Sequence, residues 1–229
     1  MITLVIATRN AHKVEEIRAI LGSGFEFKTL TDFPSAPKVI EDANTFAGNA
    51  AKKAAALARF VAPLTSDCSS PIFVLADDSG LEVDALKGAP GVHSARFAAP
   101  DPASDGNSPD ADNNTKLLQL LNDVPTENRT ARFRCVIALT PIAARSIASA
   151  SPVCHADESE LQTELFDGAC EGKIAFAPTG AKGFGYDPLF VPGGFDQSFA
   201  ELGEDVKNRM SHRAKALGKL REWFARRQT

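Results

Sequence analysis

The chain has 229 residues, of which 44% are hydrophobic and 24% are charged, and its formal net charge is −4. These fractions match the averages of globular proteins and exclude a chain that is disordered, collagen-like or coiled-coil throughout. No apolar stretch approaches the roughly 20 residues that a membrane-spanning helix needs, and the slightly acidic balance argues against binding nucleic acid through bulk charge.

The first residues do not have the pattern of an export signal, because a basic start and an A-x-A cleavage site are both missing. The four cysteines are widely spaced and form no C-x-x-C pair, which favours free thiols over a zinc site or a disulfide framework. They are Cys68, Cys135, Cys154 and Cys170. We therefore expect a cytoplasmic protein.

Strand and helix patterns alternate along the chain. In order, we expect a strand at Ile2–Ala7, a helix ending at Gly22, a strand at Phe25–Leu30, a helix at Thr45–Val61 capped by Asn44 or Thr45, a strand at Ile72–Ala76, a helix at Lys116–Leu121, strands at Ala131–Leu139 and Leu161–Glu171, and a last amphipathic helix beginning at Ser211. This alternation predicts one α/β domain over residues 1–229. Residues 98–114 are rich in Pro, Gly, Ser, Asn and Asp and predict a surface-loop insertion, whereas Ile142–Pro152 has no clear pattern.

Polar residues cluster where the predicted elements end, and α/β proteins commonly place their sites there. Thr8–Lys13 joins the first strand to the first helix, whose free N–H groups suit a phosphate. Asn10 and Lys13 add a donor and a positive charge. An ordinary strand-to-helix turn with solvated side chains explains the same residues equally well.

Two further clusters lie in the first half of the chain. Asn49 and Lys53 are four residues apart and share a helix face, although a solvated lysine on an Ala-rich helix is the simpler interpretation. Asp77–Gly80 follows the buried strand, and adjacent carboxylates there suit Mg²⁺ or general-base chemistry. Because successive strand residues point to opposite faces, only one of the two acids should face a given cleft. An Asx turn that closes a loop is the alternative.

The second half of the chain contains two more clusters. Gly180–Pro188 places three glycines around two aromatic residues, a pattern that lets the backbone approach a ligand beside a ring; a hairpin with Phe184 in the core is the alternative. Lys207 precedes Ser211–Arg213, where the serine is expected to cap the last helix and leave the next two side chains at its end. A solvated basic tail is the competing interpretation.

In this order, the motifs resemble the inosine triphosphate pyrophosphatase family, which hydrolyses non-canonical purine nucleoside triphosphates. The resemblance extends from Ile2 to about Leu220. It rests on Thr8–Lys13 with Glu16, Thr45–Ala54, Ala76–Leu81 with Gly88–Arg96, Gly183–Pro188 and Ser211–Arg213. The chain departs from the family pattern at Arg9 and in the longer segments 65–70 and 98–114.

The resemblance implies an α/β fold in which a long mixed sheet, flanked by helices, floors a cleft between two lobes of a homodimer subunit. It implies hydrolysis of ITP, dITP or XTP to the monophosphate and pyrophosphate, with Mg²⁺ as cofactor held by Glu41 and Asp78, and with Asp78 as general base. The substrate-binding residues that it implies are Thr8, Arg9, Asn10, Ala11, His12, Lys13 and Lys53, and, around the nucleoside, Ser79, Phe184, Gly185, Tyr186, Asp187, Lys207, His212 and Arg213.

Within that set, Phe184 would stack on the base. Lys207, His212 and Arg213 would aim donors at the purine O6 and so favour hypoxanthine or xanthine over adenine. Loss of Arg213 is accordingly expected to weaken discrimination more than folding.

Two other functions remain open from the sequence. A related house-cleaning pyrophosphatase would act on dTTP, UTP or modified nucleotides. A nucleotide- or nucleic-acid-binding module without catalysis would use the basic segment 204–229, but the acidic pair Asp77–Asp78 and the overall negative charge argue against it. We therefore expect a purine nucleoside triphosphate as ligand, and neither nucleic acid nor a membrane as partner.

Overall fold

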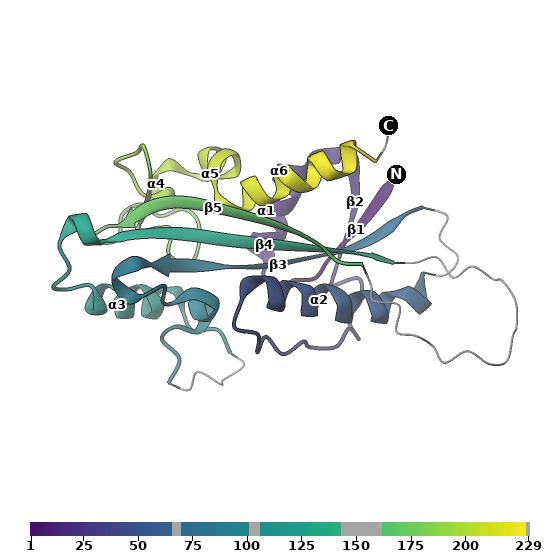
Figure 1. Ribbon diagram of the computed structural model, residues 1–229, viewed down its shortest axis with the longest axis horizontal. Helices are drawn as coiled ribbons and strands as arrows, with labels where there is room; N and C mark the ends of the chain where they lie inside the picture. Colours follow the sequence, from purple (N-terminus) through teal and green to yellow (C-terminus); the bar gives the residue numbers. More distant parts are fainter. Residues whose placement is uncertain (66–69, 101–105, 143–161, 228–229) are drawn as a thin grey trace, which may run out of the picture.

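The structure is a computed structural model that describes residues 1–65, 70–100, 106–142 and 162–227. A six-stranded mixed sheet runs through it in the order β2-β1-β3-β4-β5-β6 (Figure 1). β1 pairs in parallel with β2 and β3, and the remaining pairs are antiparallel. The strands are β1 (Ile2–Ile6), β2 (Phe25–Thr29), β3 (Ile72–Val83), β4 (Thr130–Ile142), β5 (Glu164–Ile174) and β6 (Phe190–Pro192).

Helices cover both sides of this sheet, which confirms the predicted α/β class. In Figure 1, α1, α4, α5 and α6 lie on one side, and α2 and α3 on the other. The helices are α1 (Ala11–Leu21), α2 (Phe46–Val61), α3 (Asp110–Leu120), α4 (Phe199–Leu202), α5 (Glu204–Met210) and α6 (His212–Ala225). In the described part of the chain, none of them has both the length and the apolar character needed to span a bilayer.

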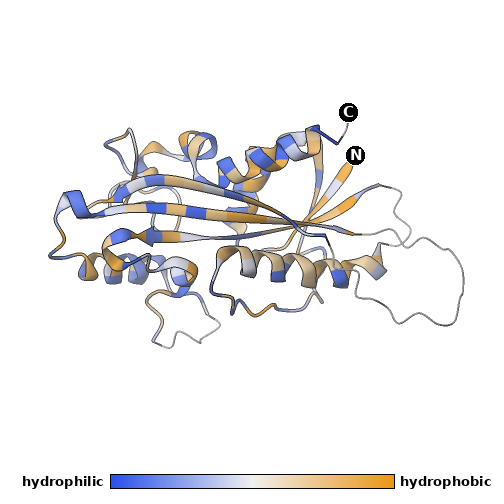
Figure 2. Cartoon of the chain, viewed as in Figure 1, coloured by the Kyte–Doolittle hydropathy of each residue, from blue (hydrophilic) through white to orange (hydrophobic). Residues whose placement is uncertain are grey.

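The alternation of side chains along the central strands creates two core layers. In β3, Val74 and Ala76 pack with α2, whereas Leu75 packs on the opposite face with α1 and α6. A third cluster lies around Phe133 and Phe190, toward the far ends of β4 and β5. Figure 2 shows hydrophobic residues in β1 and in the parts of β3 and β4 beside it, whereas hydrophobic and hydrophilic residues alternate along the rest of β4 and β5.

The caps predicted at Thr45 and Ser211 are confirmed. Each accepts a hydrogen bond from the backbone N–H three residues further on, and Asn10, for which we predicted no cap, does the same, so these residues cap α2, α6 and α1. Gly22 follows α1 with a φ of 71°, a conformation that glycine adopts without a steric penalty.

The predicted end of the third strand at Ala76 is wrong. β3 continues to Val83, so Asp77–Gly80 lies inside a strand and does not form an Asx turn. The cause is its partner β4, which pairs with β3 residue by residue up to Val83 and satisfies the backbone of this polar stretch. Periodicity within one segment does not reveal such a pairing.

The predicted loop 98–114 also needs a correction, because α3 begins at Asp110 and not at Lys116. Two aspartates in the first turn favour the helix N-terminus. Asn113, which we placed in the loop, is buried, and its side chain accepts the Ala98 N–H.

Some predictions fall wholly or partly outside the described residues. These include the middle of the insertion (101–105), most of Ile142–Pro152, and two of the four cysteines, Cys68 and Cys154. The other two, Cys135 and Cys170, are buried free thiols as expected. α4 and α5 were not predicted, because they are too short for a helical period to emerge.

The unequal lengths of the strands create an open edge in the sheet. β1 ends at Ile6 and pairs with β3 only as far as Leu75. Beyond that point, the described residues place only one isolated bridge, Glu82 with Pro90, on this edge of β3. Asp77–Gly80 therefore borders a gap, flanked by the loop that follows β1.

Candidate active site

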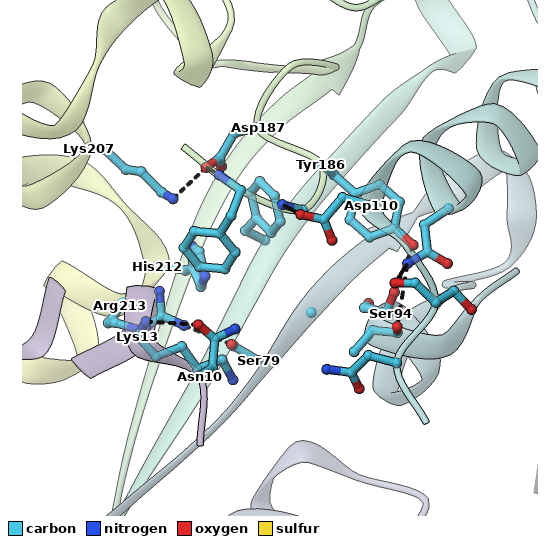
Figure 3. Close-up of a pocket in the computed structure, with 18 residues that line it drawn as sticks. Asn10, Lys13, Ser79, Ser94, Asp110, Tyr186, Asp187, Lys207, His212 and Arg213 are labelled. Atoms are coloured by element: carbon cyan, nitrogen blue, oxygen red, sulfur yellow. Dashed lines mark hydrogen bonds and ion pairs between the residues drawn. The ribbon is translucent and has the colours of Figure 1, made fainter. Parts of the chain in front are cut away.

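A cavity of about 120 Å³ lies at this gap (Figure 3). Its walls come from the loop after β1, from β3, from the segment leading into α3, from the glycine-rich loop 183–187, and from α5 and α6. In Figure 3 the cations Lys13, Lys207 and Arg213 lie on one side, with Ser94 and Asp110 on the other. The predicted site residues that line it are Asn10, Lys13, Ser79, Phe184, Gly185, Tyr186, Asp187, Lys207, His212 and Arg213.

The other predicted residues lie beside this cavity and not in its wall. Thr8, Arg9 and Ala11 line an open groove next to β2. His12 lines a second cavity, of about 420 Å³, between α1 and α5. Glu41, Lys53 and Asp78 gather on the α2 side of the sheet. The predicted site residues therefore lie in several separate places around the cavity.

Lys53 links two carboxylates on the α2 side. Its Nζ lies 3.0 Å from Glu41 Oε2 and 3.0 Å from Asp78 Oδ1. Burial raises the pKa of Asp78 to about 6, against the attraction of Lys53. Burial also acts to raise the pKa of Glu41, but Lys53 outweighs it and the net pKa is lowered. Asp78 is thus a carboxylate that titrates near neutral pH, as a general base should.

The donors at this point fit a magnesium ion. Asp78 Oδ2 is buried and has no hydrogen-bond partner, so one oxygen remains for a ligand. Mg²⁺ commonly takes one or two carboxylates and completes its shell with water and substrate phosphates. Within the described residues, no group of three or more His, Cys, Asp or Glu side chains is arranged to hold a metal. Glu41 and Asp78 would therefore need oxygen ligands from phosphate and water.

A chain of alternating charges is buried on the opposite side of β3. Arg213 Nε lies 2.9 Å from Asp77 Oδ2, and the same guanidinium pairs with Glu16. Lys207 Nζ lies 2.8 Å from Glu16 Oε1 and 2.6 Å from Asp187 Oδ2. Each charge has an opposite partner, which is the condition under which buried ions are tolerated. The network fixes both cations at the cavity wall.

Burial and the neighbouring charges set the protonation states in this network. Burial acts to raise the pKa of Asp77, but Arg213 and Lys13 outweigh it and hold the pKa well below its usual range. Burial and the same arginine lower the pKa of His212 well below 6.5. His212 is therefore neutral at pH 7, and its Nδ1 is buried without a hydrogen-bond partner. A free imidazole nitrogen at the cavity wall suits recognition of a polar ligand.

The glycine-rich loop does not bury Phe184 in the core. Phe184 is half-buried and lines the cavity, whereas Tyr186 is 4% exposed and donates its hydroxyl to the Ser94 carbonyl at 2.9 Å. Asp187 accepts the Phe184 N–H at 2.9 Å, and a Cβ at Gly183 would stand 2.3 Å from that carboxylate. The close turn therefore requires glycine at residue 183.

Sequence reasoning did not predict the structural role of two residues in the buried network. Glu16 and Asp77 hold both of the cations that the resemblance placed at the nucleoside. Alternation along the strand contained a usable signal for Asp77, because two adjacent acids must face different partners. Nothing local indicated Glu16, whose partners lie near the far end of the chain.

Comparison with known proteins gives consistent matches over almost the whole chain. The sequence profile of the Ham1 family matches residues 4–223. A dITP/XTP pyrophosphatase of Desulforamulus reducens is 48% identical over 220 residues, covering 96% of this chain and 94% of the relative. One from Shouchella clausii is 43% identical over 219 residues, again covering 96% and 94%. The structure of a HAM1 protein from Coxiella burnetii aligns with a TM-score of 0.76 at 33% identity, covering 99% of this chain and 100% of that one.

Proposed function

The chain belongs to the Ham1 family, and from this premise we propose that it hydrolyses non-canonical purine nucleoside triphosphates, such as dITP and XTP, to the monophosphate and pyrophosphate. Relatives that carry the name dITP/XTP pyrophosphatase match it over nearly its full length. The structural observation that carries the proposal is Asp78, a buried carboxylate with a pKa of about 6 and one unpartnered oxygen, held by Lys53 beside the cavity.

In this proposal Asp78 acts as the general base. It takes a proton from the water that attacks the α-phosphorus, and a pKa near the working pH makes that transfer efficient. Lys13 and Lys53 meet the triphosphate, with Asn10 as a further donor. Both lysines are already fixed by carboxylates, Lys13 by Asp77 and Lys53 by Asp78, so their positions are set before substrate arrives.

We propose Mg²⁺ as the cofactor, held by Glu41 and Asp78. When bound, the ion would neutralise charge on the phosphate oxygens and on the departing pyrophosphate. The buried, unpartnered Asp78 Oδ2 supports this assignment. The lysine that the two acids share keeps them adjacent in the absence of the ion.

Base selection belongs to the other side of the cavity. Most N–H groups of Arg213 are already bonded to Asp77, Glu16 and Ser79, so this arginine mainly holds the wall in place. The unpartnered Nδ1 of His212 is better placed to meet a polar group of the purine. Lys207 keeps one N–H for the same purpose, because its other two contact Glu16 and Asp187. A hydrogen-bonding site of this kind rejects a base whose exocyclic group leaves buried polar atoms unpaired. The homodimer and the cytoplasmic location stay predictions.

The decisive experiment measures pyrophosphate release from ITP, dITP, XTP, GTP, ATP, dTTP and UTP, each with Mg²⁺ and with EDTA. We expect metal-dependent release from the first three substrates, with ATP and GTP nearly inert. Release mainly from dTTP or UTP would instead favour a related pyrophosphatase of different specificity. No release from any substrate would contradict the enzymatic proposal and leave a nucleotide-binding protein.

A further inference from the structure

Two rings from distant parts of the chain lie face to face beside the cavity. The His12 and Phe184 ring centroids are 5.3 Å apart, and their planes are 11° from parallel. His12 lies in the first turn of α1, and Phe184 in the loop between β5 and β6. The contact therefore joins the loop assigned to the triphosphate to the loop assigned to the nucleoside.

The backbone around Phe184 is held in place, because the Phe184 N–H donates to Asp187 Oδ2 and the Gly185 N–H donates to Asp110 Oδ2. The flanking residues Gly183 and Gly185 have φ values of 79° and 62° and no side chains that could pack on the Phe184 ring. Lys207 Nζ lies 4.3 Å from the centroid of the Phe184 ring. Among the described residues, His12 is the one whose ring stacks on Phe184. The orientation of the Phe184 ring thus depends on contacts with other side chains, and His12 supplies the parallel stacking contact.

The position of His12 relative to the cavities shows which side of Phe184 it covers. Phe184 lines both the 120 Å³ cavity and the 420 Å³ cavity next to it. His12 lines only the larger one. The histidine therefore contacts Phe184 from the side of the larger cavity and is not part of the wall of the smaller one.

We propose that His12 is a positioning residue that backs Phe184 and holds its ring ready to stack on the purine base. The proposal rests on the function given above. It also assigns the His12 side chain a task other than phosphate binding, since that side chain lies in the neighbouring cavity. Stacking on Phe184 does not depend on the exocyclic groups of the base. The stack should therefore strengthen the binding of every purine substrate by the same factor.

The test compares wild type, His12→Ala and His12→Phe on dITP and XTP. A ring pair contributes enough binding energy to change an equilibrium constant by about 2- to 10-fold. We expect His12→Ala to raise KM by about that factor for both substrates, with kcat within about twofold of wild type, because stacking is uniform through the reaction. His12→Phe should restore KM. Binding of deoxyinosine monophosphate, measured by calorimetry, should weaken and recover in parallel.

A matched control separates the stack from a second contact of His12. Glu15 Oε2 lies 3.8 Å from His12 Nδ1, so Glu15→Gln removes the carboxylate beside His12 and keeps both rings; this variant should behave as wild type. The His12 side chain is 62% exposed, so its replacement should leave the melting temperature unchanged.

Three results would overturn the inference while wild type hydrolyses dITP normally. They are an unchanged KM in His12→Ala, a lowered KM, which would mean that the imidazole competes with the base for the ring, and a failure of His12→Phe to restore KM. Wild type that releases no pyrophosphate from either substrate would instead contradict the proposed function, and the binding measurement would still test the stack.

Discussion

The carboxylates of Asp77 and Asp78 are adjacent along β3 but bind cations on opposite faces of the sheet. Asp77 pairs with Lys13 of α1 and Arg213 of α6, whereas Asp78 pairs with Lys53 of α2. Asp77 is enclosed by cations that hold it ionised, while Asp78 keeps one oxygen without a partner. The two acids therefore cannot exchange roles, and they should respond differently to the same substitution.

Asp78→Asn should fold normally and lose roughly 10²-fold or more in kcat, the usual scale for a general base. Asparagine keeps the shape of the side chain but does not accept a proton from water. Steady-state hydrolysis of dITP measures the loss, and circular dichroism checks the fold. Turnover near the wild-type value would remove Asp78 from the role.

Asp77→Asn provides the contrast on the same strand. It leaves Arg213 and Lys13 with reduced counter-charge in a buried network, so we expect the free energy of unfolding to fall by about 3–5 kcal/mol. Urea denaturation measures this effect. An Asp77→Asn protein as stable as wild type would show that the network contributes little.

Arg213→Ala should destabilise the protein strongly, which revises the expectation drawn from the sequence. Arg213 is 1% exposed and neutralises both Asp77 and Glu16. Its removal leaves Asp77 with only Lys13 and Glu16 with only Lys207 as buried counter-charges, at a cost of about 3–5 kcal/mol. Thermal unfolding should show this loss. A melting temperature within a few degrees of wild type would instead support the expectation from the sequence, that loss of Arg213 weakens discrimination between bases more than it weakens folding.

Glu41→Gln should raise the Mg²⁺ concentration needed for half-maximal activity and leave folding intact. A neutral amide binds a hard divalent cation less well than a carboxylate, and Glu41 is only partly buried. Titration of MgCl₂ at saturating dITP measures the shift, with Asp42→Asn, an exposed neighbour that pairs with Lys52, as the control. Identical titrations for Glu41→Gln and wild type would argue against Glu41 as a ligand.

Acid should destabilise the fold through His212. Burial and Arg213 hold the folded pKa of His212 well below 6.5, so below that pH the unfolded chain binds a proton that the folded chain does not. This contribution to stability is complete above pH 6.5 and is lost as the pH falls toward the folded pKa. Between pH 7.5 and 5.5 the loss is about 1.4 kcal/mol for one group.

Urea unfolding at these two pH values tests the prediction. His212→Asn should lose that part of the pH dependence, whereas His93→Asn, at an exposed residue, should keep it. Equal pH dependence in His212→Asn and wild type would mean that other groups cause the acid effect.

Local features account for what the sequence predicted well. The caps Thr45 and Ser211 act within three residues, so the sequence alone indicated where these two helices start. The strand through Asp77–Gly80 depends on its pairing with β4, which a local pattern does not contain. The same contrast between local and long-range features applies to the candidate site. The motif order located the cavity wall, but the pairing of Lys207 with Glu16 joins α5 to α1 and has no signature at either position.

The ion network also ties the two ends of the polypeptide together. Glu16 and Arg213 are 197 positions apart, and Asp77 and Arg213 are 136 apart. During synthesis the early acids emerge long before the arginine that neutralises them, so a nascent chain carries Glu16 and Asp77 without that counter-charge until α6 leaves the ribosome. A chain broken off before residue 212 would have all six described strands and most of the proposed catalytic residues, yet no completed site. The site can therefore be completed only after α6 has been synthesised.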